Sequence, residues 1–390
     1  MKKSENNLLF CEIVLYLRIR VICKMEEPKG YSGKMKQICV NVENVKLVGR
    51  SLLVENVRWV ALSGAGAAFR FQGKQLAITI HGSNNATAPD NDTCYARFAI
   101  LVNGERMVDD IMDTAKKCYQ VIDKEEVQEA EVQIIKLSES AMSAIGIAPL
   151  TCDEDAVISP IARKLHTIEF IGDSITCGYG TDDMDLSHTF STQTEDVTKA
   201  YAYKTAQLLE ADYSLFSCSG YGIISGYTPD PEIRGAVELI PPYYESQCFC
   251  RDDFGSAGSP ENIPWDFSKY QPQVVVINLG TNDDSFCQDT EWKREEYRQK
   301  YVEFLKVVRK NNPEAEIFCV LGLMGDRLYD KVCLAREDYV KQTDDIHIHT
   351  IHIPDQSTVG GNVIDYHPTP QAHTMASEVV AAAIKAQMGW

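Results

Sequence analysis

The segment "IEFIGDSITCGYG", residues 168–180, begins as an apolar run and breaks off at Gly172, Asp173 and Ser174. An apolar run of this length is typical of a buried strand. Two interpretations of its end are open at this point. Either Ser174 caps the helix that follows an ordinary strand, or the turn holds Ser174 as a nucleophile at the edge of a sheet. A serine hydroxyl is a weak nucleophile until a neighbouring base takes its proton, so Ser174 alone does not decide between them.

Composition limits the classes of function. The chain has 390 residues, with 38 Lys and Arg against 56 Asp and Glu, and a net charge of −18. This length favours two or three domains, each able to bury a core of its own. The acidic excess disfavours binding to nucleic acid or to an anionic membrane, because both attract basic proteins. We therefore expect neither as a partner.

The cysteines predict neither a disulfide framework nor a zinc site. Their number, 13, is odd and they form no CxxC pair, which is typical of reduced thiols in a reducing compartment. Cys248 and Cys250 lie close together, but no second pair of ligands follows at a spacing that zinc sites use. We expect neither a metal nor a cofactor.

The start of the chain contains the apolar run "LLFCEIVLYLRIRVICKM", residues 8–25. Glu12 interrupts it, no cleavage site of small residues follows, and it is too short to span a bilayer. Translation beginning at Met25 or Met35 is an alternative. We assign residues 1–35 no role in the fold and expect a cytoplasmic protein, with secretion as the alternative.

Residues 36–150 have the pattern of short strands. Leu76, Ile78 and Ile80 alternate with smaller or polar residues, and "ARFAILVNGERMVDD" places Asn-Gly at 103–104 between two apolar runs as a tight hairpin turn. Such strands with almost no helical periodicity predict an antiparallel β-sandwich of jelly-roll type. A supporting domain and a carbohydrate-binding domain remain equally open interpretations.

The pattern changes after residues 151–164, which are polar and predict a linker. Helical stretches then separate five apolar strands, and the clearest helix, residues 290–311, has apolar side chains at intervals of three and four. This alternation predicts a three-layer α/β/α domain with a parallel sheet over residues 165–390. The predicted strands are 166–171, 213–217, 273–279, 315–323 and 346–353.

Functional groups gather at the carboxyl ends of the strands in such sheets. Three other blocks suit that position. "VVVINLGTNDD" presents Asn282, whose amide could stabilise a negative oxygen or simply occupy a turn. "LFSCSGYGII" presents Gly220, or Gly222 as the fallback, as a second N–H donor. "NVIDYHPTP" places Asp365 and His367 before the last helix, and histidine is the usual base for serine.

These four blocks, Gly-Asp-Ser, Ser-Gly, Gly-Thr-Asn-Asp and Asp-Tyr-His-Pro, follow one another along the chain. Their order resembles the SGNH (GDSL-type) hydrolase family, whose blocks supply a nucleophilic Ser, an oxyanion Gly, an oxyanion Asn and a catalytic His. The resemblance implies these roles for Ser174, Gly220, Asn282 and His367. The amide of Ser174 would be a further donor of the oxyanion hole.

The resemblance extends to the first domain. "LVNGERMVDD" and "IKLSESAM" in a jelly roll ahead of an SGNH domain are similar to the carbohydrate esterase family 2 acetylesterases, which remove O-acetyl groups from plant polysaccharides. The resemblance covers about residues 40–388 of this chain. Most SGNH enzymes have the triad Asp three residues before the His, where this chain has Ile364. Two arrangements are therefore open. Either Asp365 completes a triad, or Ser174 and His367 form a dyad in which a backbone carbonyl orients His367.

Several residues have weaker signals. Tyr221 and Trp265 lie in loops near the blocks and are predicted to stack on a sugar ring. His347 and His349 share one face of a strand, but we do not expect them to bind a metal, since SGNH catalysis needs none. His373 lies in the last helix and is predicted to be a packing or surface residue.

The sequence therefore predicts a two-domain serine esterase acting on acetylated carbohydrates, such as xylan or other plant polysaccharide fragments. Two alternatives remain. One is an SGNH lipase or thioesterase acting on longer acyl chains. The other is a carbohydrate-binding protein without catalytic activity, which the presence of all four blocks argues against.

Overall fold

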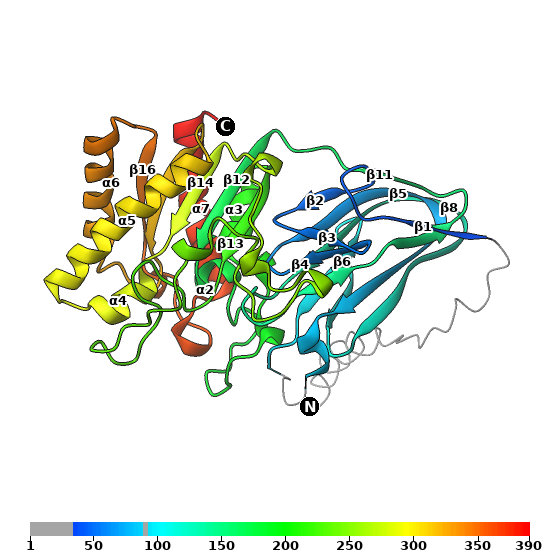
Figure 1. Ribbon diagram of the computed structural model, residues 1–390, viewed down its shortest axis with the longest axis horizontal. Coiled ribbons are helices and arrows are strands. Elements are labelled where there is room, and N and C mark those ends of the chain that lie inside the picture. The colour runs from blue at the N-terminus through cyan, green and yellow to red at the C-terminus, as the bar shows by residue number, and fades with distance from the viewer. Residues whose placement is uncertain (1–33, 89–92) are drawn as a thin grey trace, which may run out of the picture.

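The computed structural model describes residues 34–88 and 93–390, and places an antiparallel sheet beside a parallel sheet (Figure 1). The extension predicted over residues 1–35 lies outside the described residues up to residue 33. Within the described ranges, none of the helices has the length and apolar character needed to cross a membrane.

The first sheet has eleven antiparallel strands among the described residues. Its two longest strands, β5 and β8, pair along most of their length, with register shifts near Gly73 and Leu76 that bend such strands. The predicted hairpin turn is confirmed: Asn103 and Gly104 have φ of 52° and 81° and join β6 to β7. The strands are β1 Met35–Ile38, β2 Lys46–Val48, β3 Leu52–Val54, β4 Val57–Val60, β5 Gly66–Gly82, β6 Arg97–Val102, β7 Glu105–Ile111, β8 Lys116–Lys136, β9 Ile145–Ile147, β10 Leu150–Asp153 and β11 Val157–Pro160.

The linker predicted over residues 151–164 is wrong for most of its length. β10 pairs with β1 and β5, and β11 pairs with β5. Glu154 and Asp155, two exposed polar residues of this segment, lie in the turn between the two strands, whereas the polar side chain of Asp153 in β10 is buried. Pro160 ends β11, where a strand tolerates the loss of an N–H donor. The first sheet therefore continues to Pro160.

The second sheet is parallel, as predicted, and its strands lie in the order β13-β12-β14-β15-β16. Residues alternate between its faces: Val274 and Val276 pack with the cluster that contains α3 and α7, whereas Val275 and Ile277 pack with the cluster that contains α5 and α6. The predicted three layers are confirmed. The strands are β12 His166–Gly172, β13 Ala211–Ser217, β14 Val274–Asn278, β15 Glu316–Gly322 and β16 Ile348–Ile353, and the helices are α2 Ser174–Cys177, α3 Tyr201–Leu208, α4 Thr281–Cys287, α5 Glu291–Asn311, α6 Tyr329–Thr343 and α7 Pro370–Met388.

The order of the second sheet determines where a site can form. β12 is first in the chain but lies between β13 and β14, so the connection that follows β12 leads to one side of the sheet and the connection that follows β14 leads to the other. The carboxyl ends of strands at such a switch point form a crevice that suits a ligand.

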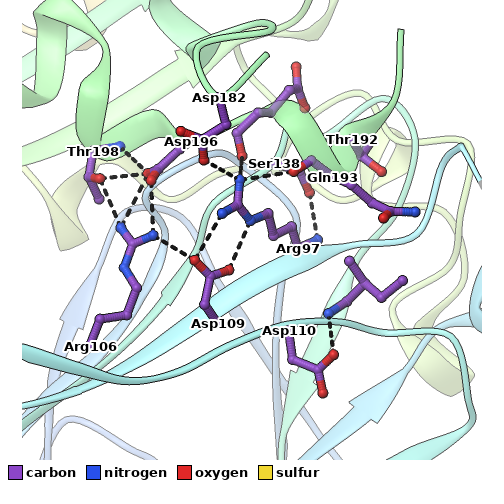
Figure 2. A network of polar contacts seen from close by, with 12 residues as sticks. Arg97, Arg106, Asp109, Asp110, Ser138, Asp182, Thr192, Gln193, Asp196 and Thr198 are labelled. Carbon is purple, nitrogen blue, oxygen red and sulfur yellow. Dashed lines mark hydrogen bonds and ion pairs between the residues drawn. The ribbon is translucent and has the colours of Figure 1, made fainter. Parts of the chain in front are cut away.

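A network of charged groups joins the two domains beside this edge (Figure 2). Arg97 pairs with Asp109 at 2.8 Å and with Asp182 at 2.6 Å, and Arg106 pairs with Asp109 at 2.8 Å and with Asp196 at 2.9 Å. Burial raises the pKa of Asp109, but the two guanidinium groups together hold it below its usual value. The first sheet therefore holds the segment that follows α2.

Replacement of Arg106 by alanine is expected to lower the free energy of unfolding by about 2 kcal/mol, because the fully buried Asp196 side chain loses a charged donor. Thermal unfolding of the whole chain measures this. Arg70→Ala is the matched control: its pair with Glu131 is more than half exposed at both ends, so Tm should stay unchanged. Equal shifts in Tm for both variants would contradict a structural role of the network.

Candidate active site

Ser174 is the first residue of α2, directly after β12. The cap of α2 is Asp173, whose side chain accepts a hydrogen bond from the amide of Ile175 at 3.0 Å. The interpretation of Ser174 as a helix cap is therefore wrong. Its Oγ instead lies 2.7 Å from Nε2 of His367, which is the distance at which a base can take the proton of a nucleophile.

The backbone of Asp365 orients His367. Nδ1 of His367 lies 3.0 Å from the carbonyl oxygen of Asp365, which accepts its hydrogen bond. The Asp365 carboxylate points elsewhere and accepts a hydrogen bond from the hydroxyl of Tyr179 at 2.7 Å. Asp365 and Tyr366 have φ of 50° and 61°, a region that is strained for residues other than glycine. This turn directs the carbonyl of Asp365 at the imidazole, so the arrangement is that of the dyad and not of the triad.

Tyr179 contacts both the imidazole of His367 and the carboxylate of Asp365. Its ring stacks on the His367 imidazole with centroids 4.1 Å apart, and Phe190 stacks on the opposite side at 4.5 Å. Burial raises the pKa of the Tyr179 hydroxyl, and its bond to Asp365 raises it further. Tyr179 therefore stays a neutral donor that holds both the imidazole ring and the Asp365 turn. Only its place five residues after Ser174 could have suggested this from the sequence.

Gly220 suits the role of an oxyanion donor better than Gly222. Gly220 has φ of 82° and open space where a Cβ would project, so its backbone is accessible to a ligand. The amide of Gly222 donates to the carbonyl of Glu238 at 3.1 Å, and a Cβ there would lie 2.0 Å from the carbonyl oxygen of Ser225. The structure thus favours Gly220, as expected, over the fallback.

Asn282 lies beside Asp173, at the carboxyl ends of neighbouring strands. Its Nδ2 donates to the carbonyl oxygen of Tyr221 at 2.9 Å and to Oδ2 of Asp173 at 3.2 Å. Burial raises the pKa of Asp173 to about 7. An oxyanion would therefore compete with Asp173 for one of the two amide protons.

Asp283, the residue after Asn282, was not singled out by sequence reasoning. Its buried carboxylate accepts hydrogen bonds from the amides of Ile223, Ile224 and Ser225 at 2.7 to 3.1 Å. These charge-assisted bonds hold the loop that follows Gly220. Burial nevertheless raises the pKa of Asp283 to about 6.

The structure contradicts the two predicted sugar-stacking residues. Tyr221 is only 4 % exposed and packs against Tyr243 and Phe249, so it contributes a backbone carbonyl and not a ring face. Trp265 lines a crevice whose wall includes Thr167, at the amino end of β12. Trp265 is only 9 % exposed, and the Arg50 guanidinium lies over its ring at 5.4 Å from the centroid, so it does not present a free ring face either.

The remaining histidines have structural partners. His373 is fully buried in α7, as a packing residue would be, and its Nδ1 accepts a hydrogen bond from the amide of Tyr201 at 3.1 Å. His347 and His349 both contact the carboxylate of Glu316 at 2.6 Å. Over residues 34–88 and 93–390 the structure groups no three His, Cys, Asp or Glu side chains in a way that could hold a metal.

The pH dependence of activity should show the burial of His367. Burial lowers the pKa of His367 to about 4, even though the carbonyl and carboxylate of Asp365 raise it. Only the neutral imidazole can accept the Ser174 proton. As the pH is lowered, kcat/KM should therefore fall with a midpoint near pH 4, and not near the value of about 6.5 for a free histidine. A pH profile of ester hydrolysis measures this. Asp173→Asn, which removes another titrating group, should keep that midpoint; a midpoint at 6.5 or above would contradict a buried neutral base.

Comparison with known proteins identifies the family of each domain. Residues 170–375 match the GDSL-like Lipase/Acylhydrolase family, and residues 47–161 match the Carbohydrate esterase 2 N-terminal family. The Cellulase/esterase CelE of Acetivibrio thermocellus is 33 % identical over 243 residues, which are 60 % of this chain and 27 % of that protein. The chain thus spans about a quarter of that relative's length. An acetylxylan esterase / glucomannan deacetylase of Cellvibrio japonicus is 24 % identical over 84 % of this chain and 86 % of its own length.

Solved structures resemble both domains together. A family two carbohydrate esterase from Clostridium thermocellum, in complex with cellohexaose, superposes with a TM-score of 0.74 at 26 % identity, covering 89 % of this chain and 99 % of that one. The acetyl xylan esterase Est2A from Butyrivibrio proteoclasticus has a TM-score of 0.80 at 20 % identity over 92 % and 99 % of the two chains, which supports the fold. With its carbohydrate esterase 2 N-terminal domain followed by the four blocks, the chain belongs to the GDSL-like lipase/acylhydrolase family.

Proposed function

We propose that this protein is a serine esterase that removes O-acetyl groups from carbohydrates such as xylan or other plant polysaccharide fragments. The observation that carries the proposal is the 2.7 Å contact between Ser174 Oγ and His367 Nε2, at the edge of the sheet where Gly220 and Asn282 also lie. The substrate class rests on the names of the relatives, which include acetylxylan esterases.

In the proposed reaction, Nε2 of His367 takes the proton of Ser174 as Oγ attacks the acetyl carbonyl carbon. The resulting oxyanion accepts hydrogen bonds from the amides of Ser174 and Gly220 and from the side chain of Asn282, whose bond to Asp173 it replaces. The Asp365 carbonyl holds Nδ1–H of the imidazolium. His367 then gives its proton to the departing sugar hydroxyl, which leaves an acetyl group on Ser174.

Deacylation follows the same route with water as the nucleophile. His367 takes a proton from water, the hydroxide oxygen attacks the acetyl-Ser174 carbonyl, and the oxyanion occupies the same donors. Collapse of this intermediate returns the proton to Ser174 Oγ and releases acetate. No cofactor is needed to balance either step.

Two exposed aromatic residues are better placed than Tyr221 and Trp265 to contact a sugar. Tyr366 precedes His367 and is 76 % exposed, and Tyr227, whose amide donates to the carbonyl of Gly220 at 2.8 Å, is 66 % exposed. A free ring face beside the reacting group could stack on a pyranose, because the C–H face of a sugar is apolar.

The proposal predicts a preference for short acyl groups and for glycans. Hydrolysis of 4-nitrophenyl acetate should be much faster than hydrolysis of the butyrate, and acetylated xylo-oligosaccharides should release acetate. Tyr366→Ala and Tyr227→Ala should raise KM for the oligosaccharide several-fold and leave KM for 4-nitrophenyl acetate unchanged. A preference for butyrate or longer esters would favour a lipase or thioesterase, and glycan binding without turnover would favour a carbohydrate-binding protein.

A further inference from the structure

A buried carboxyl group of the first domain reaches the oxyanion block of the second. Glu139 lies in the segment that connects β8 to β9 and is completely buried. Its Oε2 accepts a hydrogen bond from the amide of Ser219 at 2.7 Å. Ser219 immediately precedes Gly220, so a side chain of the antiparallel domain contacts the backbone next to the proposed oxyanion donor.

The peptide group that carries the Gly220 N–H lies between two peptide groups that are each held by a hydrogen bond. On one side the Ser219 amide donates to Glu139, and on the other the Gly220 carbonyl accepts from the amide of Tyr227 at 2.8 Å. Two hydrogen bonds to adjacent peptide groups restrict the rotation of the group between them. With φ of 82° at Gly220, the direction of its N–H is therefore determined from both sides.

Glu139 is itself held in place by buried groups. Its own amide donates to Oε2 of Glu195 at 2.9 Å, and the ammonium of Lys136 donates to the carbonyl oxygens of Ser138 and Glu139 at 2.7 Å each. All four residues are buried. These bonds fix the backbone of Glu139, and burial confines the side chain that extends from it, so its Oε2 can define the position of the amide that it contacts.

We propose that Glu139 is a positioning residue for the oxyanion hole: it holds the Ser219 amide so that the next amide, of Gly220, points at the reacting carbonyl. This inference rests on the proposed esterase function. It assigns the first domain a part in catalysis beyond support, because the second domain has no acceptor of its own at the Ser219 amide among the residues that the structure describes.

Two substitutions in the full chain separate acceptor geometry from charge. Glu139→Gln keeps the length and an acceptor oxygen, whereas Glu139→Asp keeps the carboxyl group but withdraws it by one methylene from Ser219. If geometry matters, the Asp variant should lose about 10-fold in kcat for 4-nitrophenyl acetate and Glu139→Ala about 10²-fold, the size of a lost oxyanion donor. The Gln variant should stay within a few-fold of the wild type, and KM should change by less than about 2-fold in all three.

The matched control is Asp252→Ala. Asp252 is another buried carboxyl group between the domains, and it accepts bonds from the amides of Asn84 and Asn85 at 3.1 Å without touching Ser219 or Gly220. It should lower Tm and leave kcat unchanged. Since Glu139→Ala removes a buried acceptor and could fail to fold, the Gln and Asp pair tests the proposal without it.

Two results would overturn the inference: a wild-type kcat in Glu139→Asp, or a loss in Glu139→Gln as large as that in Glu139→Asp. Ser174→Ala, assayed alongside, separates this failure from a failure of the proposed function. If Ser174→Ala keeps wild-type activity, the proposed serine mechanism, and with it the oxyanion hole built around Ser174, is wrong. If Ser174→Ala is inactive while Glu139→Asp keeps the wild-type kcat, only the role of Glu139 is wrong.

Discussion

Ser174→Ala is expected to lower kcat for 4-nitrophenyl acetate by about 10⁴-fold or more, since removing a serine nucleophile costs losses of this order or larger in serine hydrolases. The substitution removes only Oγ, whose contact is Nε2 of His367 at 2.7 Å. Helix α2 should persist because its cap is the Asp173 side chain. The measurement is steady-state kinetics with an unfolding curve for each protein.

A matched control for this experiment is Ser143→Ala. Ser143 is equally buried, and its hydroxyl has no hydrogen-bond partner among the described residues. This variant should keep wild-type activity. If Ser174→Ala also kept it, Ser174 would not be the nucleophile, and another group would have to carry the hydrolysis.

His367→Ala should lose as much activity as Ser174→Ala, whereas Asp365→Asn should lose less than about 10-fold. His367 is the only imidazole that the structure places on Ser174 Oγ among the described residues. Its orientation depends on the carbonyl of Asp365, which any residue at that position provides. Asparagine also tolerates the left-handed conformation found there. The Asp365→Asn variant therefore removes only the negative charge of the carboxylate that Tyr179 contacts.

The double variant Ser174→Ala/His367→Ala is the control for this assignment. Groups that act as one unit lose activity non-additively, so it should be no slower than either single variant. Severe and equal losses in Asp365→Asn and His367→Ala would restore the Asp365 carboxylate as a full member of a triad.

The sequence predicted the parallel sheet well because its signals are local. β14 is buried along its whole length and begins with four consecutive apolar residues, and β12 is buried from Ile168 to Gly172. Short apolar runs of this kind are typical of strands that are covered on both faces. Ser174, Gly220, Asn282 and His367 also follow from the sequence as candidates, since each block lies next to such a strand or before α7.

The features that sequence reasoning missed depend on long-range packing. The strands β10 and β11 look like a linker because they are only four residues long and are joined by a short polar turn. Tyr221 and Trp265 lie in loops whose path over the sheet has no sequence signature, and both side chains are buried. Glu139 contacts Ser219 across 80 residues of chain, a contact that no motif within one domain could indicate.

The most direct test of the central claim is to label the nucleophile with diethyl 4-nitrophenyl phosphate, which phosphorylates activated serines, and to locate the label by peptide mass spectrometry. The account predicts one diethylphosphoryl group per wild-type chain, on the peptide that contains Ser174. It also predicts that His367→Ala, which lacks the base, is labelled far more slowly. Labelling of another residue, or an unlabelled wild type that still hydrolyses 4-nitrophenyl acetate, would contradict it.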